Sequence, residues 1–243
     1  MNPQKNGEKS KMVTGTIVTI AGGILWGVSG VCGQYMFQNK GVTAPWLVSV
    51  RLVVAGLLML CYYFLTDREQ TLAIWKSKRD RRDVIIYGLL GMLPCQYAYF
   101  QTIEWSNAGT ATVIQYLGPA LIVIWVCFRT KRMPTLQEIT GVILAVIGVF
   151  LIATHGNPTS LALSGRALLM GLASAVSVAI YTLEPARLQK KYDTPLILAW
   201  GMTIGGVALT VCFIENQLLG ILALLVTVIV GFIVASQGND RGA

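Results

Sequence analysis

Residues 44–66 read APWLVSVRLVVAGLLMLCYYFLT, and the loop that follows them at 67–82 reads DREQTLAIWKSKRDRR. The first string holds a single charged residue, Arg51, whereas basic residues dominate the second. An apolar helix of about 20 residues crosses a hydrocarbon layer about 30 Å thick, and basic loops stay on the cytoplasmic side of a membrane. The two strings therefore predict a membrane-spanning helix that ends at the cytoplasmic face.

The same alternation of apolar stretches and basic loops runs through the whole chain. The predicted spans lie near 12–37, 44–66, 83–102, 108–128, 136–154, 164–183, 194–214 and 218–235. Of the 19 Lys and Arg residues, all but Lys40, Arg51 and Arg166 fall in the terminal segments or in alternate loops. This asymmetry predicts an all-α polytopic bundle of about eight transmembrane helices in the cell membrane, plasma or inner, with both termini in the cytoplasm.

Composition excludes several other classes of protein. Apolar residues make up 54% of the chain and charged residues 12%, whereas charged residues are about a quarter of a soluble domain. The net charge of +8 is divided among short loops without a nucleic-acid-binding motif, so we expect contact with anionic lipid rather than nucleic acid. His155 is the only histidine and no Cys, Asp or second His lies near it, so neither a metal site nor a cofactor is expected.

An internal repeat appears at a constant offset of 150 residues. Residues 165–213 align without gaps on 15–63, with Gly15 matching Gly165, Val28 matching Val178, Lys40 matching Lys190, Pro45 matching Pro195 and Gly56 matching Gly206. Apolar and polar character also agrees across this window. The second half of the chain is therefore predicted to begin as a copy of the first.

The register of the repeat changes near the end of the chain. The segment 141–148 resembles 220–227, at an offset of 79, so about 71 residues are missing from the second copy. We expect a cytoplasmic tail at 1–11, a five-helix repeat at 12–154, a truncated second repeat at 164–235 and a second tail at 236–243. Because five is odd, the two copies enter the membrane from opposite sides, which makes an incomplete 5+5 inverted repeat of the kind found in secondary transporters.

Four strings carry a resemblance to a known family. They are Gly-Ile-Leu-Trp-Gly-Val-Ser-Gly at 23–30, the segment from Pro45 through Arg51 to Gly56, the segment from Tyr99 through Ser106-Asn-Ala-Gly-Thr-Ala to Pro119, and 141–148. In order and spacing they resemble EamA-type members of the drug/metabolite transporter superfamily. That resemblance implies ten helices around a central cavity, lined by the first four helices of each repeat, through which small metabolites pass. The chain departs from the family pattern where the inner loop 129–134 lacks an acidic residue and where the family's helices eight and nine have no counterpart.

Charged residues inside the predicted spans are few. Arg51 lies about 10 Å from the outer end of its span, at 1.5 Å per residue. It either extends outward to water or a helix-end carbonyl, or supplies a cation to the cavity. Glu104 is expected as a solvated acid at an outer turn, and Glu184 in a cytoplasmic salt bridge.

Uncharged polar residues give the candidate substrate site. Tyr97 with Gln101, and Thr112 with Gln115, are spaced so that each pair shares a helix face, and amides avoid lipid. The full candidate set is Trp26, Arg51, Gln96, Tyr97, Gln101, Thr112, Gln115 and Tyr116. The alternative interpretation is hydrogen bonding between helices alone. Prolines at 94 and 119 predict kinks, and the spacing Gly23-x-x-x-Gly27 and Gly201-x-x-x-Gly205 predicts close helix packing or a sliding surface.

The sequence favours a transporter over an enzyme. All Asp residues lie in loops or at span edges, and Gly-x-Ser-x-Gly, His-Glu-x-x-His and phosphate-binding glycine-rich motifs are absent from it. We expect gradient-driven or facilitative transport of a small molecule. The alternative is a transport-inactive remnant, or a chain active only as an oligomer, and we expect the faces of spans six and seven around Ser174, Ser177 and Trp200 to lack a partner within the chain.

Overall fold

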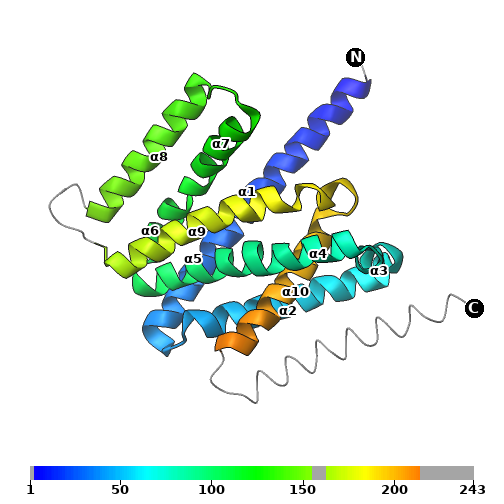
Figure 1. Cartoon of the computed structure of the whole chain (residues 1–243), viewed down its shortest axis with the longest axis horizontal. Coiled ribbons are helices and arrows are strands. Elements are labelled where there is room, and N and C mark those ends of the chain that lie inside the picture. Colours follow the sequence, from blue (N-terminus) through cyan, green and yellow to red (C-terminus); the bar gives the residue numbers. More distant parts are fainter. Residues whose placement is uncertain (1–2, 155–162, 214–243) are drawn as a thin grey trace, which may run out of the picture.

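The protein is a bundle of helices. A computed structural model describes residues 3–154 and 163–213, and within these ranges all regular secondary structure is helical (Figure 1). The long helices are α1 (Pro3–Lys40), α2 (Ala44–Thr66), α5 (Leu93–Trp105), α7 (Leu117–Thr130), α8 (Leu136–Thr154), α9 (Gly165–Leu183) and α10 (Thr194–Phe213). Shorter pieces are α3 (Arg68–Lys76), α4 (Lys78–Ile86), the π-helix η1 (Tyr87–Met92), α6 (Ala108–Gln115) and the 3₁₀ turns η2 (Glu184–Ala186) and η3 (Leu188–Lys190).

Most of the predicted spans are confirmed. Six segments in the described ranges are long and apolar enough to cross a membrane, and they match the predicted spans one, two, four, five, six and seven. The third predicted span, 83–102, falls within the uninterrupted succession of α4, η1 and α5. The eighth span, the C-terminal tail and His155 lie outside the described residues. The protein is therefore an all-α polytopic membrane protein.

Both predicted proline kinks coincide with breaks in regular helix. Pro94 stands at the start of α5, directly after the π-helical turn, where the amide of Leu93 bonds to the carbonyl of Gly88. Pro119 lies three residues after Tyr116, which separates α6 from α7. Because proline lacks an N–H and its ring crowds the preceding turn, the helix must change its hydrogen-bond pattern on that side.

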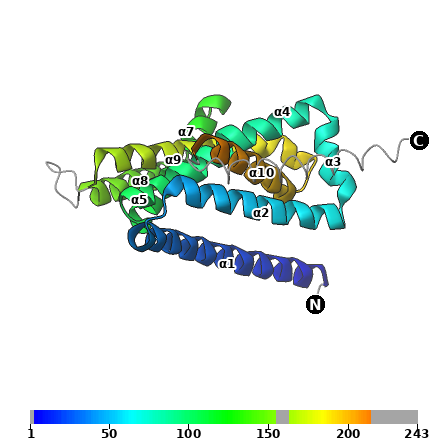
Figure 2. The ribbon, with the colours of Figure 1, turned by 90° about the horizontal axis from the view of Figure 1, so that it is seen from below.

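The centre of the bundle is the contact of α2 with α10, which lie side by side in Figures 1 and 2. A Cβ atom on Gly56 would lie 2.7 Å from the backbone nitrogen of Thr203, and one on Gly206 would lie 2.8 Å from that of Val53. These two contacts exchange when 150 is added to or subtracted from each residue number. The pairing is what a two-fold relation between the repeats requires.

The basic loop 67–82 is folded into the helices α3 and α4 and joins the two halves of the chain. Asp80 on α4 accepts hydrogen bonds from Arg187 at 2.6 Å and Tyr192 at 3.0 Å, and Lys191 lies 3.1 Å from it. Asp83 accepts from the same Arg187 at 2.7 Å. We call these five residues the Asp80 cluster. Burial alone would raise the pKa of Asp80, but the hydrogen bonds from its cationic and phenolic partners lower that pKa to about 2.

The two pairs of spaced glycines behave differently. Gly201 contacts the ring of Tyr87, and a Cβ atom on Gly205 would lie 2.9 Å from the carbonyl oxygen of Gly88, so the close packing predicted for this pair is confirmed. By contrast, a Cβ atom added to Gly23 or Gly27 on α1 would have no atom of another described helix within 4 Å, so close packing is not seen at this pair. Figure 2 shows α1 along one edge of the bundle, with the other helices on one side of it.

Candidate functional site

Arg51 lies at the junction of three helices. Its Nη1 donates to Ser29 Oγ on α1 at 2.8 Å, and its Nη2 donates to Gln96 Oε1 on α5, also at 2.8 Å. The guanidinium carbon lies 4.5 Å from the centroid of the Phe100 ring. The Arg51 side chain therefore bonds across the bundle and not to a helix-end carbonyl, and its role as a cation in a substrate cavity stays a prediction.

Aromatic residues extend this junction. The hydroxyl of Tyr99 is 2.9 Å from Thr112 Oγ1 on α6, and the Tyr99 ring lies 5.9 Å from that of Trp26 and 5.3 Å from that of Phe100, measured between centroids. Trp26 is 43% exposed and forms the rim. We define the Arg51 cluster as Trp26, Ser29, Arg51, Gln96, Tyr99, Phe100 and Thr112.

Three members of this cluster were not among the predicted site residues. Tyr99 and Phe100 follow Gln96 by three and four positions, and Ser29 follows Trp26 by three. Residues at these spacings share a helix face. Helical spacing from Trp26 and Gln96 would therefore have predicted Ser29, Tyr99 and Phe100, whereas Tyr97 and Gln101 mark a different face of α5.

No carboxylate among the described residues forms an ion pair with Arg51, because every ion pair found there involves other groups. A charge at the centre of a span costs about 2.5–3.5 kcal/mol on insertion scales, while a cation over an aromatic ring gains about 0.5–2 kcal/mol. Hydrogen bonds to Ser29 and Gln96 offset more of the cost, but these partners are neutral and leave a net positive charge inside the membrane region.

Gln101 belongs to a different group of contacts. Its Nε2 donates to Glu104 Oε2 at 2.9 Å, and the same oxygen accepts the backbone N–H of Ala44 at 2.8 Å. Thr43, the N-cap residue of α2, makes no side-chain cap bond. Glu104 therefore caps α2 from a neighbouring helix, and the expectation of a merely solvated acid is wrong.

Gln115 joins the two repeats. Its Nε2 donates to Ser174 Oγ on α9 at 2.7 Å, and its Oε1 is buried and has no hydrogen-bond partner among the described residues. Tyr97 is half-buried against the core, and Tyr116, the next residue after Gln115, is 57% exposed. The predicted set is thus divided: Trp26, Arg51, Gln96 and Thr112 come together, whereas Gln101 and Gln115 bond to other partners.

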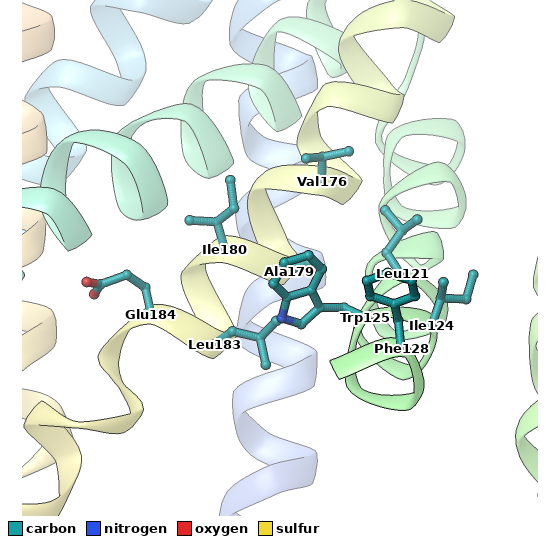
Figure 3. Close-up of a pocket in the computed structure, with 9 residues that line it drawn as sticks. All are labelled: Leu121, Ile124, Trp125, Phe128, Val176, Ala179, Ile180, Leu183 and Glu184. Carbon is teal, nitrogen blue, oxygen red and sulfur yellow. The ribbon is translucent and has the colours of Figure 1, made fainter. Parts of the chain in front are cut away.

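A groove lies away from the Arg51 cluster, between α7 and α9 (Figure 3). It measures about 610 Å³ and is lined by Leu121, Ile124, Trp125, Phe128, Val176, Ala179, Ile180, Leu183 and Glu184. Glu184 is its single charged residue and lies at one end, where one carboxylate oxygen is buried without a described hydrogen-bond partner. The predicted salt bridge of Glu184 is therefore wrong, because no basic side chain in the described ranges pairs with it.

The surface of α1 that corresponds to this groove in the repeat is covered by other helices of the chain. In the 150-residue register, Ala179, Ile180, Leu183 and Glu184 of the groove correspond to Ser29, Gly30, Gly33 and Gln34 of α1. All four α1 residues contact the first repeat: Ser29 bonds Arg51, Gly30 meets Tyr99, Gly33 meets Phe100 and Gln34 accepts the amide of Ala108 at 2.8 Å. On α1 this face meets α2, α5 and α6, whereas on α9 it opens into the groove.

The opposite faces of the same two helices show the reverse arrangement. On α9, Ala167, Gly171, Ser174 and Ala175 are buried, and Gly171 and Ser174 contact Ile114 and Gln115 of α6. Their counterparts on α1, Ile17, Ala21, Ile24 and Leu25, are exposed, by 69% in the case of Leu25. Of the six candidate spans in the described ranges, the one on α1 is the least buried.

The prediction that spans six and seven lack partners is wrong. Ser174 is buried against Gln115, Ser177 is 6% exposed, and the ring of Trp200 lies 4.9 Å from that of Trp75. In the described bundle, α6 of the first repeat therefore packs on one face of α9, the counterpart of α1 in the 150-residue register.

The fold and the Arg51 cluster define a polytopic helical membrane protein with a polar junction inside its spans. A family model described as the EamA-like transporter family matches residues 13–154. This match covers more than half of the chain, and the chain belongs to the EamA-like transporter family.

Two relatives agree with this assignment. An uncharacterized inner membrane transporter, YicL, of Salmonella typhimurium strain LT2 is 38% identical over 195 residues, which cover 80% of this chain and 65% of the relative. An uncharacterized transporter of Archaeoglobus fulgidus is 26% identical over 186 residues, covering 76% of this chain and 62% of the relative. The chain thus spans less than two thirds of the length of either relative. No solved structure matches it significantly.

Proposed function

We propose that the chain contributes one wall and the substrate-contacting residues of a transporter for small metabolites, driven by a gradient or working by facilitated exchange. The observation that carries this proposal is the Arg51 cluster, in which a cation, an amide and three hydroxyls from four helices meet within the membrane region. Polar groups at such positions commonly mark substrate pathways. Catalytic motifs and a nucleotide site are absent from the sequence, which favours transport over enzymatic activity or ATP-driven pumping.

The pathway needs a second wall. The groove beside α9 and the exposed face of α1 are the two surfaces that a counterpart of α4 to α7 in the second repeat would cover. Alternating access requires two repeats that move against each other around an enclosed site. We therefore infer that the chain by itself inserts into the membrane without transporting, and that a two-helix segment, in an oligomer or a second polypeptide, restores the closed pathway.

The orientation follows from charge. The Asp80 cluster, the start of α1 and the turn at 131–135 lie toward the same end of the bundle in Figure 1, and this end carries the basic loops. We infer that it faces the cytoplasm, as does the N-terminus, in a cell membrane whose anionic lipid contacts these basic loops.

Uptake into proteoliposomes tests this function. A two-helix segment would be taken from the part of the Salmonella relative that this chain does not span, and would be supplied either fused or in trans. Using a panel of radiolabelled amino acids, organic acids and sugars, we expect saturable uptake only when the segment is present. Arg51→Ala should reduce that uptake about tenfold or more, because charge-assisted hydrogen bonds contribute about 1.5–3 kcal/mol.

Arg166→Ala is the matched control, since Arg166 is an exposed arginine at the start of α9. Equal uptake by the Arg51 and Arg166 variants would exclude the Arg51 cluster from the pathway. Saturable uptake by a demonstrated monomer of the chain alone would show that the second wall is not needed.

A further inference from the structure

The Arg51 cluster has the features of an anion site rather than of a structural junction alone. Ser29 Oγ and Gln96 Oε1 take one hydrogen bond each from Arg51, and a guanidinium carries five N–H donors. Further donors therefore remain for an oxyanion. Glu104, on the same helix as Gln96, forms no ion pair with Arg51 among the described residues, and its Oε2 accepts the amide of Ala44 and a hydrogen bond from Gln101.

A purely structural link between α1, α2 and α5 does not require a charge. Gln or Asn at position 51 would offer hydrogen bonds without the cost of placing a cation in the membrane region. The planar guanidinium is instead the side chain that recognises carboxylates and phosphates with paired hydrogen bonds. Because only neutral partners surround it among the described residues, an anionic ligand would complete its environment.

The surroundings of Arg51 also indicate the rest of the ligand. Phe100 lies beneath the guanidinium, Tyr99 packs at right angles to Phe100, and the 43% exposed ring of Trp26 borders the cluster on the side of the uncovered α1 face. These rings offer an apolar and aromatic surface next to the charge. A ligand that matches both features carries a carboxylate at one end and an apolar or aromatic body at the other.

We propose that the Arg51 cluster binds the carboxylate of a small organic anion whose apolar portion lies against Trp26 and Tyr99. This names the substrate class of the proposed transport site and rests on that proposed function. Because binding is measured without transport, the two proposals can be contradicted independently. Benzoate binding without uptake would contradict the transport function but not the anion site.

The test is thermal stabilisation of the full chain in neutral detergent by benzoate and by benzamide, which share a ring but differ in charge. We expect benzoate to raise the unfolding midpoint saturably and to bind about tenfold more tightly than benzamide. Arg51→Gln should abolish this preference, Arg51→Lys should keep it in weaker form, and Arg166→Gln should leave it unchanged. Equal stabilisation by the two ligands, or a preference that survives in Arg51→Gln, would overturn the proposal.

Two further measurements complete the test, one by chemical modification of arginine and one with an anionic lipid. If Arg51→Gln does not fold, modification of the unaltered chain by phenylglyoxal replaces it, and benzoate should slow the reaction of Arg51 but not that of Arg166. Phosphatidylglycerol added to the micelles tests whether a lipid headgroup supplies the anion. Arg51-dependent stabilisation by this lipid without stabilisation by benzoate would assign the site to lipid and refute the organic-anion proposal.

Discussion

Replacing Gly56 by alanine should separate the two helices at the centre of the bundle. The new Cβ atom would lie 2.5 Å from Thr203 Oγ1 and 2.7 Å from the backbone nitrogen of Thr203. A side-chain rotation cannot relieve the second contact, because it involves the main chain of α10. The helices themselves have to move.

The size of the effect follows from this geometry. Ordinary van der Waals contacts begin near 3.4 Å, so α2 and α10 would have to separate by about 0.7 Å. A gap of about 0.5–1 Å forfeits a quarter to a half of the attraction between atoms along the interface, and overpacking typically costs about 1–3 kcal/mol. For a chain of this size we expect a loss of about 2–10 °C in the unfolding midpoint.

Thermal unfolding in detergent, monitored by size-exclusion chromatography, measures the fall in the unfolding midpoint. Gly23→Ala is the matched control, since Gly23 lies in another candidate span and no atom of a neighbouring element lies within 4 Å of the added carbon. It should leave stability unchanged or raise it, because alanine has the higher helix propensity. Gly206→Ala should behave like Gly56→Ala, and the double variant should cost less than the sum because both open one interface. If Gly56→Ala is as stable as Gly23→Ala, the two-fold packing of the repeats is incorrect.

Three further outcomes are expected. Because the pKa of Asp80 is lowered to about 2, its contribution to stability should be constant above pH 4 and be lost as pH falls toward 2. Asp80→Asn should remove this acid dependence and lower the free energy of unfolding by about 3 kcal/mol. An unchanged pH profile in this variant would exclude the Asp80 cluster as the cause of the acid dependence. In intact cells, Ser77→Cys should be protected from an impermeant thiol reagent and Lys40→Cys labelled, whereas labelling at 77 would reverse the proposed orientation. Gln115→Leu should destabilise the chain by about 1–3 kcal/mol, because it leaves the buried Ser174 hydroxyl without its donor, and Ser174→Ala should reduce that loss in a double-mutant cycle; additive effects would mean that the bond contributes little.

Local patterns in the sequence were sufficient to place the spans. Apolar length and loop charge predicted the helices, since these signals depend on each segment's own contact with the bilayer. The breaks near Pro94 and Pro119 were also predictable, because the missing N–H and the ring of proline act within one turn.

The contacts between helices were less accessible to sequence analysis. Helical spacing grouped Tyr97 with Gln101, but it gave no sign of which face of α5 meets Arg51, and the partners of Gln101 and Glu104 depend on how α2 approaches α5. The capping role of Glu104 was missed because it is supplied from a different helix. Such contacts depend on tertiary arrangement, which spacing within one helix does not encode.

The uncovered surfaces were predicted on the wrong helices for a related reason. If the repeats were two successive units, the loss of helices would expose their neighbours in sequence, around Ser174 and Trp200. The two-fold contact of Gly56 with Thr203 and of Gly206 with Val53 shows that the halves interlock. By this two-fold relation, we expect the repeat counterpart of α6, which packs on α9, to pack on α1, far away in sequence.

We expect one two-helix segment to cover both the exposed face of α1 and the groove beside α9. Photo-crosslinking in membranes tests it most directly, with benzoylphenylalanine in place of Leu25 or Ile180 and a tagged segment from the Salmonella relative expressed in trans. Leu144, which is 68% exposed on α8, is the control position. We expect crosslinks to the segment from positions 25 and 180 and none from 144. Equal crosslinking from all three positions, or from 144 alone, would contradict it.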